Sequence, residues 1–215
     1  MKALYWLTVN HLLKKALISA MNSSALSSFR LVGGTSLSLQ LGHRKSVDID
    51  LFTDATYNSI DFNAIDGFFK STFPYVSTNN PGQPGMGTSY FLGNDAQDAI
   101  KVDLYYTDTF IRPELKVGNI RLAMLEDISA MKLDVISRGG RKKDFWDLHE
   151  LADHHHISAM MQFHQERYPY SHNYNLLKAM LNNFSLADDD FEPDCLRGKH
   201  WELIKLDIVQ LSKLL

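Results

Sequence analysis

The sequence has little cysteine and no long apolar run, and both features limit what the protein can be. With Cys195 alone, the 215 residues cannot form an internal disulfide, which fits a reducing, cytoplasmic setting. The N-terminal stretch resembles a secretion signal, but polar residues between Asn10 and Lys15 interrupt it, and no other segment approaches a membrane span. We therefore expect a cytoplasmic protein that has no membrane partner.

A strong charge of either sign is also missing. The formal net charge is −3 at pH 7, so nothing draws the whole molecule to nucleic acid or to an anionic membrane. Any such contact would need a local basic patch. The apolar fraction of 45% is enough for a folded core, which excludes a disordered chain.

The pattern of apolar residues predicts an α+β protein. Residues 1–123 combine an N-terminal amphipathic helix with short alternating stretches, which predict a mixed β-sheet with flanking helices. Residues 124–215 predict a helical C-terminal region packed on this α/β core. Its predicted helices cover 124–138, 143–153, 157–168, 173–184 and 200–215. Outside these helices, a strand is predicted at 75–79, a glycine- and proline-rich turn at 81–87, and an acidic loop at 188–194.

Three aspartates on two predicted strands carry the strongest functional signal. In VDIDLF, alternation along the strand puts Asp48 and Asp50 on one face and the apolar side chains on the other. In IKVDLYY, the same alternation puts Asp103 on the polar face of a second strand. If the strands are neighbours, the three carboxylates supply the hard oxygen ligands that Mg²⁺ or Mn²⁺ binds. Two such ions about 3.5–4 Å apart would activate an attacking hydroxyl and stabilise a departing pyrophosphate.

A diglycine before a short helix predicts a place for phosphate. Gly33 and Gly34 let the backbone approach a phosphate at the N-terminus of the helix TSLSLQL. Thr35 and Ser36 add hydroxyl groups, and Arg44 can reach the same phosphates with a bidentate guanidinium. Taken alone, a DxD pair is more often a solvated strand face, and a diglycine is usually a turn. Together, and with a third aspartate on a second strand, they favour a nucleotide site.

The helical region adds charged residues that have two interpretations each. Lys132 lies on the apolar stripe of its predicted helix, so it either extends to solvent or enters a polar pocket, where it would neutralise phosphate charge. Asp144 and Asp147 share one side of the next helix, either as an exposed acidic face or as part of the site. The run SRGGRKK at 137–143 is either a solvated loop or a grip for triphosphate or an RNA backbone.

In combination, these motifs resemble the AbiEii/AbiGii family of nucleotidyltransferase-fold toxins, within the DNA polymerase β-like superfamily. GGTSLSLQLGHRKSVDIDLF resembles the first motif of that family, and IKVDLYY resembles the strand with its third acidic residue. LEDISAMKLDVISRGGRKKDFWDLHEL resembles the later motifs, a helix with an inward lysine and then a D-x-x-D-L helix. The resemblance runs from Phe29 to Leu151. It implies a nucleotidyltransferase fold, and a role for Asp147 in positioning nucleotide or metal.

We therefore expect a metal-dependent nucleotidyltransferase that transfers a nucleoside monophosphate from an NTP to an acceptor hydroxyl. Asp48, Asp50 and Asp103 would hold the metal, with Asp103 also assisting deprotonation of the acceptor, and Lys132 and Asp147 would complete the catalytic set. The resemblance implies the toxin of a toxin–antitoxin or phage-defence system, with RNA, such as a tRNA 3′ end, as acceptor and an antitoxin as partner. Two alternatives remain, a kinase-like phosphotransferase on the same fold and a non-enzymatic nucleotide-binding or interaction module.

Overall fold

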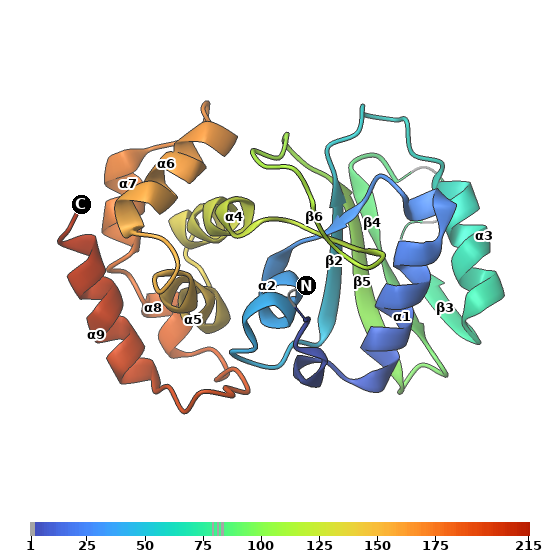
Figure 1. The fold of residues 1–215 in the computed structure, drawn as a ribbon, viewed down its shortest axis with the longest axis horizontal. Helices are drawn as coiled ribbons and strands as arrows, with labels where there is room; N and C mark the ends of the chain where they lie inside the picture. The colour runs from blue at the N-terminus through green and yellow to red at the C-terminus, as the bar shows by residue number, and fades with distance from the viewer. Residues whose placement is uncertain (1–2, 79, 81, 83) are drawn as a thin grey trace.

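The computed structural model describes residues 3–78, 80, 82 and 84–215, which form a sheet lobe and a helical lobe (Figure 1). The strands are β1 (Arg30–Leu31), β2 (Asp48–Thr53), β3 (Tyr75–Thr78), β4 (Gly87–Gly93), β5 (Ala99–Tyr106), β6 (Leu115–Val117) and β7 (Ile120–Leu122). They make one sheet in the order β3-β4-β5-β2-β1-β7-β6. β2 pairs in parallel with β5, and β1 with β7, whereas the other neighbouring pairs are antiparallel. The predicted mixed sheet is confirmed.

Two of the predicted segments of this lobe extend beyond the described residues. The predicted strand 75–79 corresponds to β3, and its last residue lies outside them. The predicted turn 81–87 also includes residues outside them, and β4 begins at its last position.

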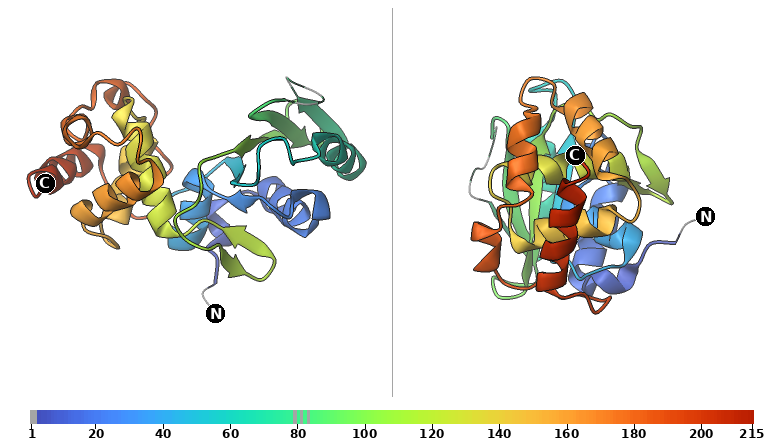
Figure 2. Two further views of the ribbon diagram at one scale, coloured as in Figure 1. Left: turned by 90° about the horizontal axis from the view of Figure 1, so that it is seen from above. Right: turned by 90° about the vertical axis from the view of Figure 1, so that its left-hand side faces the viewer.

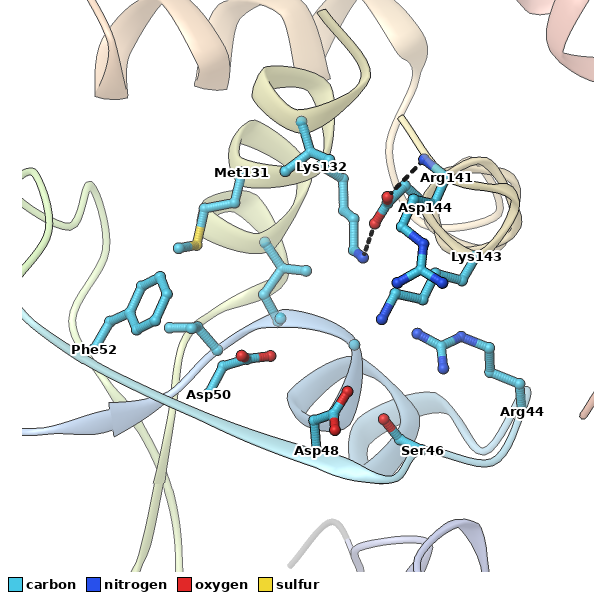
Figure 3. Close-up of a pocket in the computed structure, with 15 residues that line it drawn as sticks. Arg44, Ser46, Asp48, Asp50, Phe52, Met131, Lys132, Arg141, Lys143 and Asp144 are labelled. Carbon is cyan, nitrogen blue, oxygen red and sulfur yellow. Dashed lines mark hydrogen bonds and ion pairs between the residues drawn. The ribbon is translucent and has the colours of Figure 1, made fainter. Parts of the chain in front are cut away.

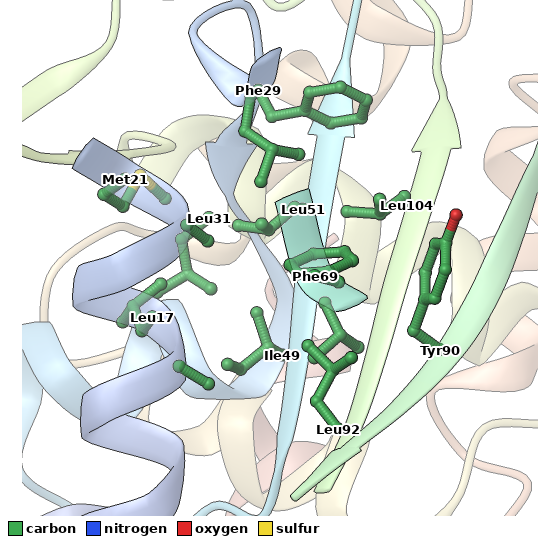
Figure 4. Close-up of a cluster of buried hydrophobic side chains, with 14 of the residues drawn as sticks. Leu17, Met21, Phe29, Leu31, Ile49, Leu51, Phe69, Tyr90, Leu92 and Leu104 are labelled. Atoms are coloured by element: carbon green, nitrogen blue, oxygen red, sulfur yellow. The ribbon is translucent and has the colours of Figure 1, made fainter. Parts of the chain in front are cut away.

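The alternation predicted for the two central strands positions the site. Along β2 and β5, buried residues alternate with partly exposed ones. The helices of this lobe are α1 (His11–Asn22) and α3 (Phe62–Thr72). Buried side chains of both strands, such as Leu51 and Leu104, pack with these helices in one hydrophobic cluster (Figure 4). The aspartates of the two strands therefore point to the opposite face of the sheet.

Helix α2 (Gly33–Leu41) joins the two lobes. Leu39 belongs to the hydrophobic cluster that α1 and α3 form with the sheet. Leu37 and Leu41 belong to a second cluster, which is built mainly from the helical lobe. Figure 1 shows α2 between the lobes, and the view from above in Figure 2 also separates them. The helices of the helical lobe are α4 (Leu125–Ser137), α5 (Lys142–Leu151), α6 (Ile157–Arg167), α7 (Tyr174–Met180), α8 (Ser185–Asp188) and α9 (Trp201–Ser212). A site built on both lobes is thus held together by α2.

One predicted helix, 173–184, is divided in the structure. α7 ends at Met180, and α8 begins at Ser185 and extends into the predicted acidic loop. Asn183 explains the break, because its Oδ1 atom accepts hydrogen bonds from both the backbone N–H and the hydroxyl of Ser185. Asparagine favours such local bonds at helix starts over a place inside a helix.

Among the helices of the described residues, none is long and apolar enough to cross a membrane.

Candidate active site

A cavity of about 340 Å³ lies between the polar face of the sheet and the helical lobe (Figure 3). The sheet lobe and α2 line it with Val32, Gly33, Gly34, Arg44, Ser46, Asp48, Asp50 and Phe52. The helical lobe lines it with Ile128, Met131, Lys132, Val135, Arg141, Lys143 and Asp144. The chain therefore brings most of the predicted site residues to one cavity.

The carboxylates of Asp48 and Asp50 lie on its sheet side. Asp50 stands in register with Asp103 of the parallel strand β5. Burial raises the pKa of Asp50 to about 6, with further increases from the charges of Asp103 and Asp48 that outweigh the opposite effect of Lys132. Near neutral pH, this carboxylate therefore lacks a sufficient positive partner, and a bound cation would supply one.

Asp103 lies on the strand beside Asp50, but its carboxylate is already bonded. Ser89 Oγ donates to Oδ1 over 2.5 Å, and Lys101 Nζ donates to Oδ2 over 2.7 Å. Within the described ranges, no three His, Cys, Asp or Glu side chains are grouped closely enough to hold a metal ion. The donor chemistry nevertheless fits a hard divalent ion, because Asp48 and Asp50 face one cavity and Asp103 could join them by releasing Lys101.

The diglycine forms the first turn of α2, two residues earlier than the predicted helix. Gly33 has a φ of +65°, a conformation that favours glycine, and a Cβ atom there would overlap the Asp50 carboxylate. The first N–H groups of a helix have no partner within it, and here they lie beside the cavity because both glycines line it. This end of α2 can therefore bind a phosphate next to the carboxylates.

The structure places the Thr35 and Ser36 hydroxyls away from the predicted phosphate site. Both residues are fully buried. Thr35 Oγ1 donates to the backbone oxygen of Asp48 and lies 2.7 Å from Ser46 Oγ. Ser36 Oγ accepts a hydrogen bond from Gln40 Nε2, one turn further along α2. Gly33 and Gly34 form the part of the first turn that faces the cavity, whereas Thr35 and Ser36 face the interior. Thr35 fixes α2 against the start of β2, Ser36 bonds within α2, and neither residue lines the cavity.

Asp147 on α5 is fully buried and holds two cations of the site, Arg44 and Lys132, in place. Its carboxylate accepts hydrogen bonds from Arg44 Nε and Nη2 over 2.7 and 2.8 Å, and Lys132 Nζ and His43 Nε2 each lie 2.7 Å from it. Burial would raise the pKa of Asp147, but the charges of Arg44 and Lys132 and the hydrogen bonds from Arg44 and His43 hold it well below its usual range. Asp147 thus acts behind the cavity wall and does not line the cavity.

Lys132 enters the polar interior, the second of its two predicted orientations. It is buried, and its Nζ donates to Asp144 Oδ1 over 2.7 Å. The other oxygen of Asp144 accepts the backbone N–H of Arg141 over 2.9 Å, at the start of α5. Burial would lower the pKa of Lys132, but the charges of Asp147 and Asp144 outweigh it and raise the pKa. The ammonium group is therefore permanently charged at the edge of the cavity.

Several contributors to the site were not predicted from the sequence, among them His43, Phe52 and Met131. His43 completes the bonds to Asp147, and Phe52 and Met131 give the cavity an apolar end (Figure 3). Phe52 continues the alternation of Asp48 and Asp50 along β2, so the strand pattern contained its signal. The sequence gives no comparable signal for His43 or Met131, because their positions depend on how the two lobes pack.

Gly34→Ala is expected to displace Arg44 and to lower catalytic activity about 10- to 100-fold, since small displacements of substrate-binding groups have effects of this size. A Cβ atom at Gly34 would overlap Arg44 Nη2 and lie 3.4 Å from Asp147 Oδ2, so the guanidinium can avoid the overlap only by disturbing its buried ion pair with Asp147. Steady-state kinetics would measure the loss. Gly67→Ala is the matched control, because Gly67 is also in a helix and a Cβ atom there meets nothing within 4 Å. Equal activity of both variants would contradict the role of Arg44.

Comparisons with known proteins show what this chain is similar to. Residues 15–214 match the family model described as "Nucleotidyl transferase AbiEii toxin, Type IV TA system". An uncharacterized protein of Aquifex aeolicus is 29% identical over 148 residues, which is 66% of this chain and 66% of that relative's length. The structure is similar to a putative nucleotidyltransferase from Helicobacter pylori, with a TM-score of 0.57 at 18% identity over 94% of this chain and 90% of that one.

It is also similar to MenT4, a nucleotidyltransferase toxin from Mycobacterium tuberculosis, with a TM-score of 0.57 at 14% identity over 94% of this chain and 84% of that one. At such identities, the structural likeness shows the fold. The predicted nucleotidyltransferase fold is confirmed.

Proposed function

The chain belongs to the AbiEii family of nucleotidyl transferase toxins, and we propose that its cavity transfers a nucleoside monophosphate from an NTP to an acceptor hydroxyl. One observation carries this proposal. Asp48 and Asp50 face cations from Arg44, Lys132 and Lys143 across a single cavity, beside the N-terminus of α2. A metal-bound polyphosphate needs both halves of this arrangement, because the carboxylates suit the ion and the cations suit the phosphate oxygens.

The carboxylates would bind Mg²⁺ or Mn²⁺. Asp48 and Asp50 would hold it from β2, and Asp103 would join them after leaving Lys101. When bound, a divalent ion would supply Lewis-acid stabilisation of the charge that develops on the phosphate oxygens. We propose this metal dependence from the donor set and from the raised pKa of Asp50.

The remaining residues would bind and orient the nucleotide. The N–H groups of Gly33 and Gly34, together with Arg44 and Lys132, would hold the β- and γ-phosphates and place the α-phosphorus near the carboxylates. The acceptor oxygen then attacks that phosphorus, the bond to the β-phosphate oxygen breaks, and pyrophosphate leaves. Asp103 would take the proton of the acceptor hydroxyl.

The apolar end of the cavity fits the nucleoside. Phe52 and Met131 lie on the far side of Asp50 from Arg44 (Figure 3), so a nucleotide can extend from cations to apolar side chains across the carboxylates. Stacking on an aromatic side chain suits any nucleobase, because each base has a π-face.

The biological role follows from the family. We propose a cytoplasmic toxin of a toxin–antitoxin or phage-defence pair, with an antitoxin as partner and RNA, first of all a tRNA 3′ end, as acceptor. The family description supports the toxin role. The RNA acceptor rests on the resemblance stated above and on the basic run around Arg141 that borders the cavity.

Incubating the protein with total RNA and either α- or γ-labelled NTPs, with and without Mg²⁺, tests the reaction. We expect the α-label alone to enter RNA, and we expect EDTA to prevent it. Transfer of the γ-label would favour the kinase-like alternative, which the same fold could support. If no acceptor were labelled with any NTP in the presence of Mg²⁺ or Mn²⁺, the transferase proposal would be contradicted. An Asp48→Asn, Asp50→Asn double variant is the negative control for labelling by contaminants.

A further inference from the structure

An acidic segment of the helical lobe reaches the cationic side of the cavity. It covers residues 188–194 and begins at the last residue of α8, which packs on α5. Its end is attached to the sheet lobe, because Lys45 N–H donates to the Asp194 carbonyl oxygen over 2.9 Å and Cys195 forms a β-bridge with Arg44. Both ends of the segment are therefore fixed close to the cavity.

Arg141 lines the cavity, yet its guanidinium is paired with this segment. Its Nε and Nη2 atoms lie 3.2 and 3.1 Å from the two carboxylate oxygens of Asp190. A guanidinium offers the same two-bond fork to a phosphate. The Arg141 side chain is 61% exposed, whereas that of Asp190 is 14% exposed. The carboxylate is held in place, and the guanidinium has solvent around it in which to rotate.

Asp190 also lies where an anion is favoured. Its pKa is lowered, first by the hydrogen bond from Arg141 and then by the charge of Arg141 and the backbone N–H groups of Phe191 and Lys142. Lys142 is the first residue of α5, so the carboxylate lies against a helix N-terminus. A phosphate group would be favoured by the same surroundings.

Two other cations of the cavity wall, Arg44 and Lys132, differ from Arg141 in their partner. Arg44 and Lys132 are paired with Asp147, which is fully buried, so their charged groups cannot move toward a ligand without breaking a buried ion pair. An exposed ion pair, in contrast, is weak and readily exchanged.

We propose that Arg141 is a further ligand of the polyphosphate of the nucleotide, and that it must leave Asp190 to bind it. The inference rests on the proposed function and deepens it, because it makes the affinity of the phosphate site depend on a competing carboxylate from the helical lobe. In the free protein the Asp190 carboxylate is paired with the Arg141 guanidinium, and in the complex the phosphate oxygens of the nucleotide take the place of that carboxylate.

Calorimetric titration of the full-length protein with inorganic tripolyphosphate tests this proposal without any turnover. Asp190→Asn is expected to bind tripolyphosphate about two- to five-fold more tightly than the unchanged protein, since an exposed ion pair no longer competes. Arg141→Ala is expected to bind it about five-fold more weakly or worse, because one charge-assisted contact is lost. Asp189→Asn is the matched control, since Asp189 is an exposed neighbour with the same charge. We expect its affinity to stay close to that of the unchanged protein.

The double variant distinguishes competition from a general charge effect. With Arg141→Ala already present, Asp190→Asn is expected to have no further effect, because the competition requires the guanidinium. An equal gain in both backgrounds, or weaker binding by Asp190→Asn alone, would overturn the proposal, the second because Asp190 would then position Arg141 for the ligand. Thermal melting of each variant confirms that it is folded.

The failure of the inference differs from the failure of the proposed function. Tripolyphosphate binding that Gly34→Ala weakens, but that responds equally to Asp190→Asn and Asp189→Asn, would overturn the inference and leave the phosphate site intact. Absence of binding to the unchanged protein and to all variants would overturn both.

Discussion

Asp50→Asn is expected to lower the rate of nucleotidyl transfer on the order of 10³-fold or more, which corresponds to about 4 kcal/mol of transition-state stabilisation. The substitution keeps the shape of the side chain and removes one of the two carboxylates on the sheet side of the cavity. Asparagine offers one weak oxygen ligand in place of a charged one, so the divalent ion would be bound loosely or wrongly. Single-turnover kinetics with saturating NTP would measure the loss. Asp189→Asn is expected to keep full activity.

The same substitution is expected to stabilise the metal-free fold by about 1–3 kcal/mol at pH 8. The pKa of Asp50 is raised from 3.8 to about 6 in the folded protein, so folding favours the protonated form. That contribution is fully present below pH 4 and is lost as the pH rises through 6. Above pH 6 the fold must hold a charged carboxylate near Asp48 and Asp103, and asparagine removes this cost. Below pH 4 the two proteins are expected to differ little.

Urea denaturation in EDTA at pH 8 and at pH 4 would measure this difference. Adding Mg²⁺ at pH 8 is expected to stabilise the unchanged protein and not the variant, because the ion binds the folded state alone. A variant that is as active as the unchanged protein, or less stable than it in EDTA, would contradict the assignment of Asp50. Growth arrest on expression should disappear with the activity if the chain is toxic through catalysis.

The alternation of apolar and acidic residues was enough to predict on which face of each strand the three aspartates lie. Because side chains on a strand alternate, Asp48, Asp50 and Asp103 had to share the face opposite to Leu51, and the parallel pairing of β2 with β5 then placed them side by side. The position of Lys132 on an apolar stripe likewise required either a solvent-exposed or a pocket position, and its buried ion pairs show the second.

The features of the site that could not be predicted depend on how α2 and the helical lobe pack against the rest of the protein. Thr35 and Ser36 lie in a helix as predicted, but they are buried, because the side of α2 that faces the cavity depends on how α2 packs between the two lobes. The pairing of Arg141 with Asp190 joins residues 49 positions apart, and the helices α5, α6, α7 and α8 lie between them in the sequence. Neither residue carries a sequence pattern that specifies the other.

Asp147→Ala is expected to lower the free energy of unfolding by about 3–5 kcal/mol and to abolish measurable transfer. The change leaves the buried Arg44 guanidinium and Lys132 ammonium without the carboxylate that both share, and it removes the partner of His43. Uncompensated buried charges are costly, so these side chains would move toward solvent through the cavity that should hold phosphate. Urea denaturation and nucleotide-binding measurements would report the two effects.

The pH dependence of this loss has a definite sign. The pKa of Asp147 is held well below its usual value in the fold, so its contribution to stability is present above the unfolded pKa and is lost as the pH falls through the folded one. Asp147→Ala should therefore be much less stable than the unchanged protein at pH 7, and the two should converge in strong acid. A difference in stability that stayed constant down to strong acid would contradict the ionised state of Asp147.

Asp127→Ala separates the role of Asp147 in the site from its role in stability. Asp127 is also fully buried and paired with an arginine, Arg167, at 3.0 Å, but it does not line the cavity. Its removal is expected to cost a similar amount of stability for the same physical reason. Because Arg44 and Lys132 keep their partner in that variant, the folded fraction should bind nucleotide and turn it over normally. Of the two substitutions, only Asp147→Ala should change the affinity for phosphate. Equal inactivation of the two folded variants would mean that Asp147 contributes only to stability.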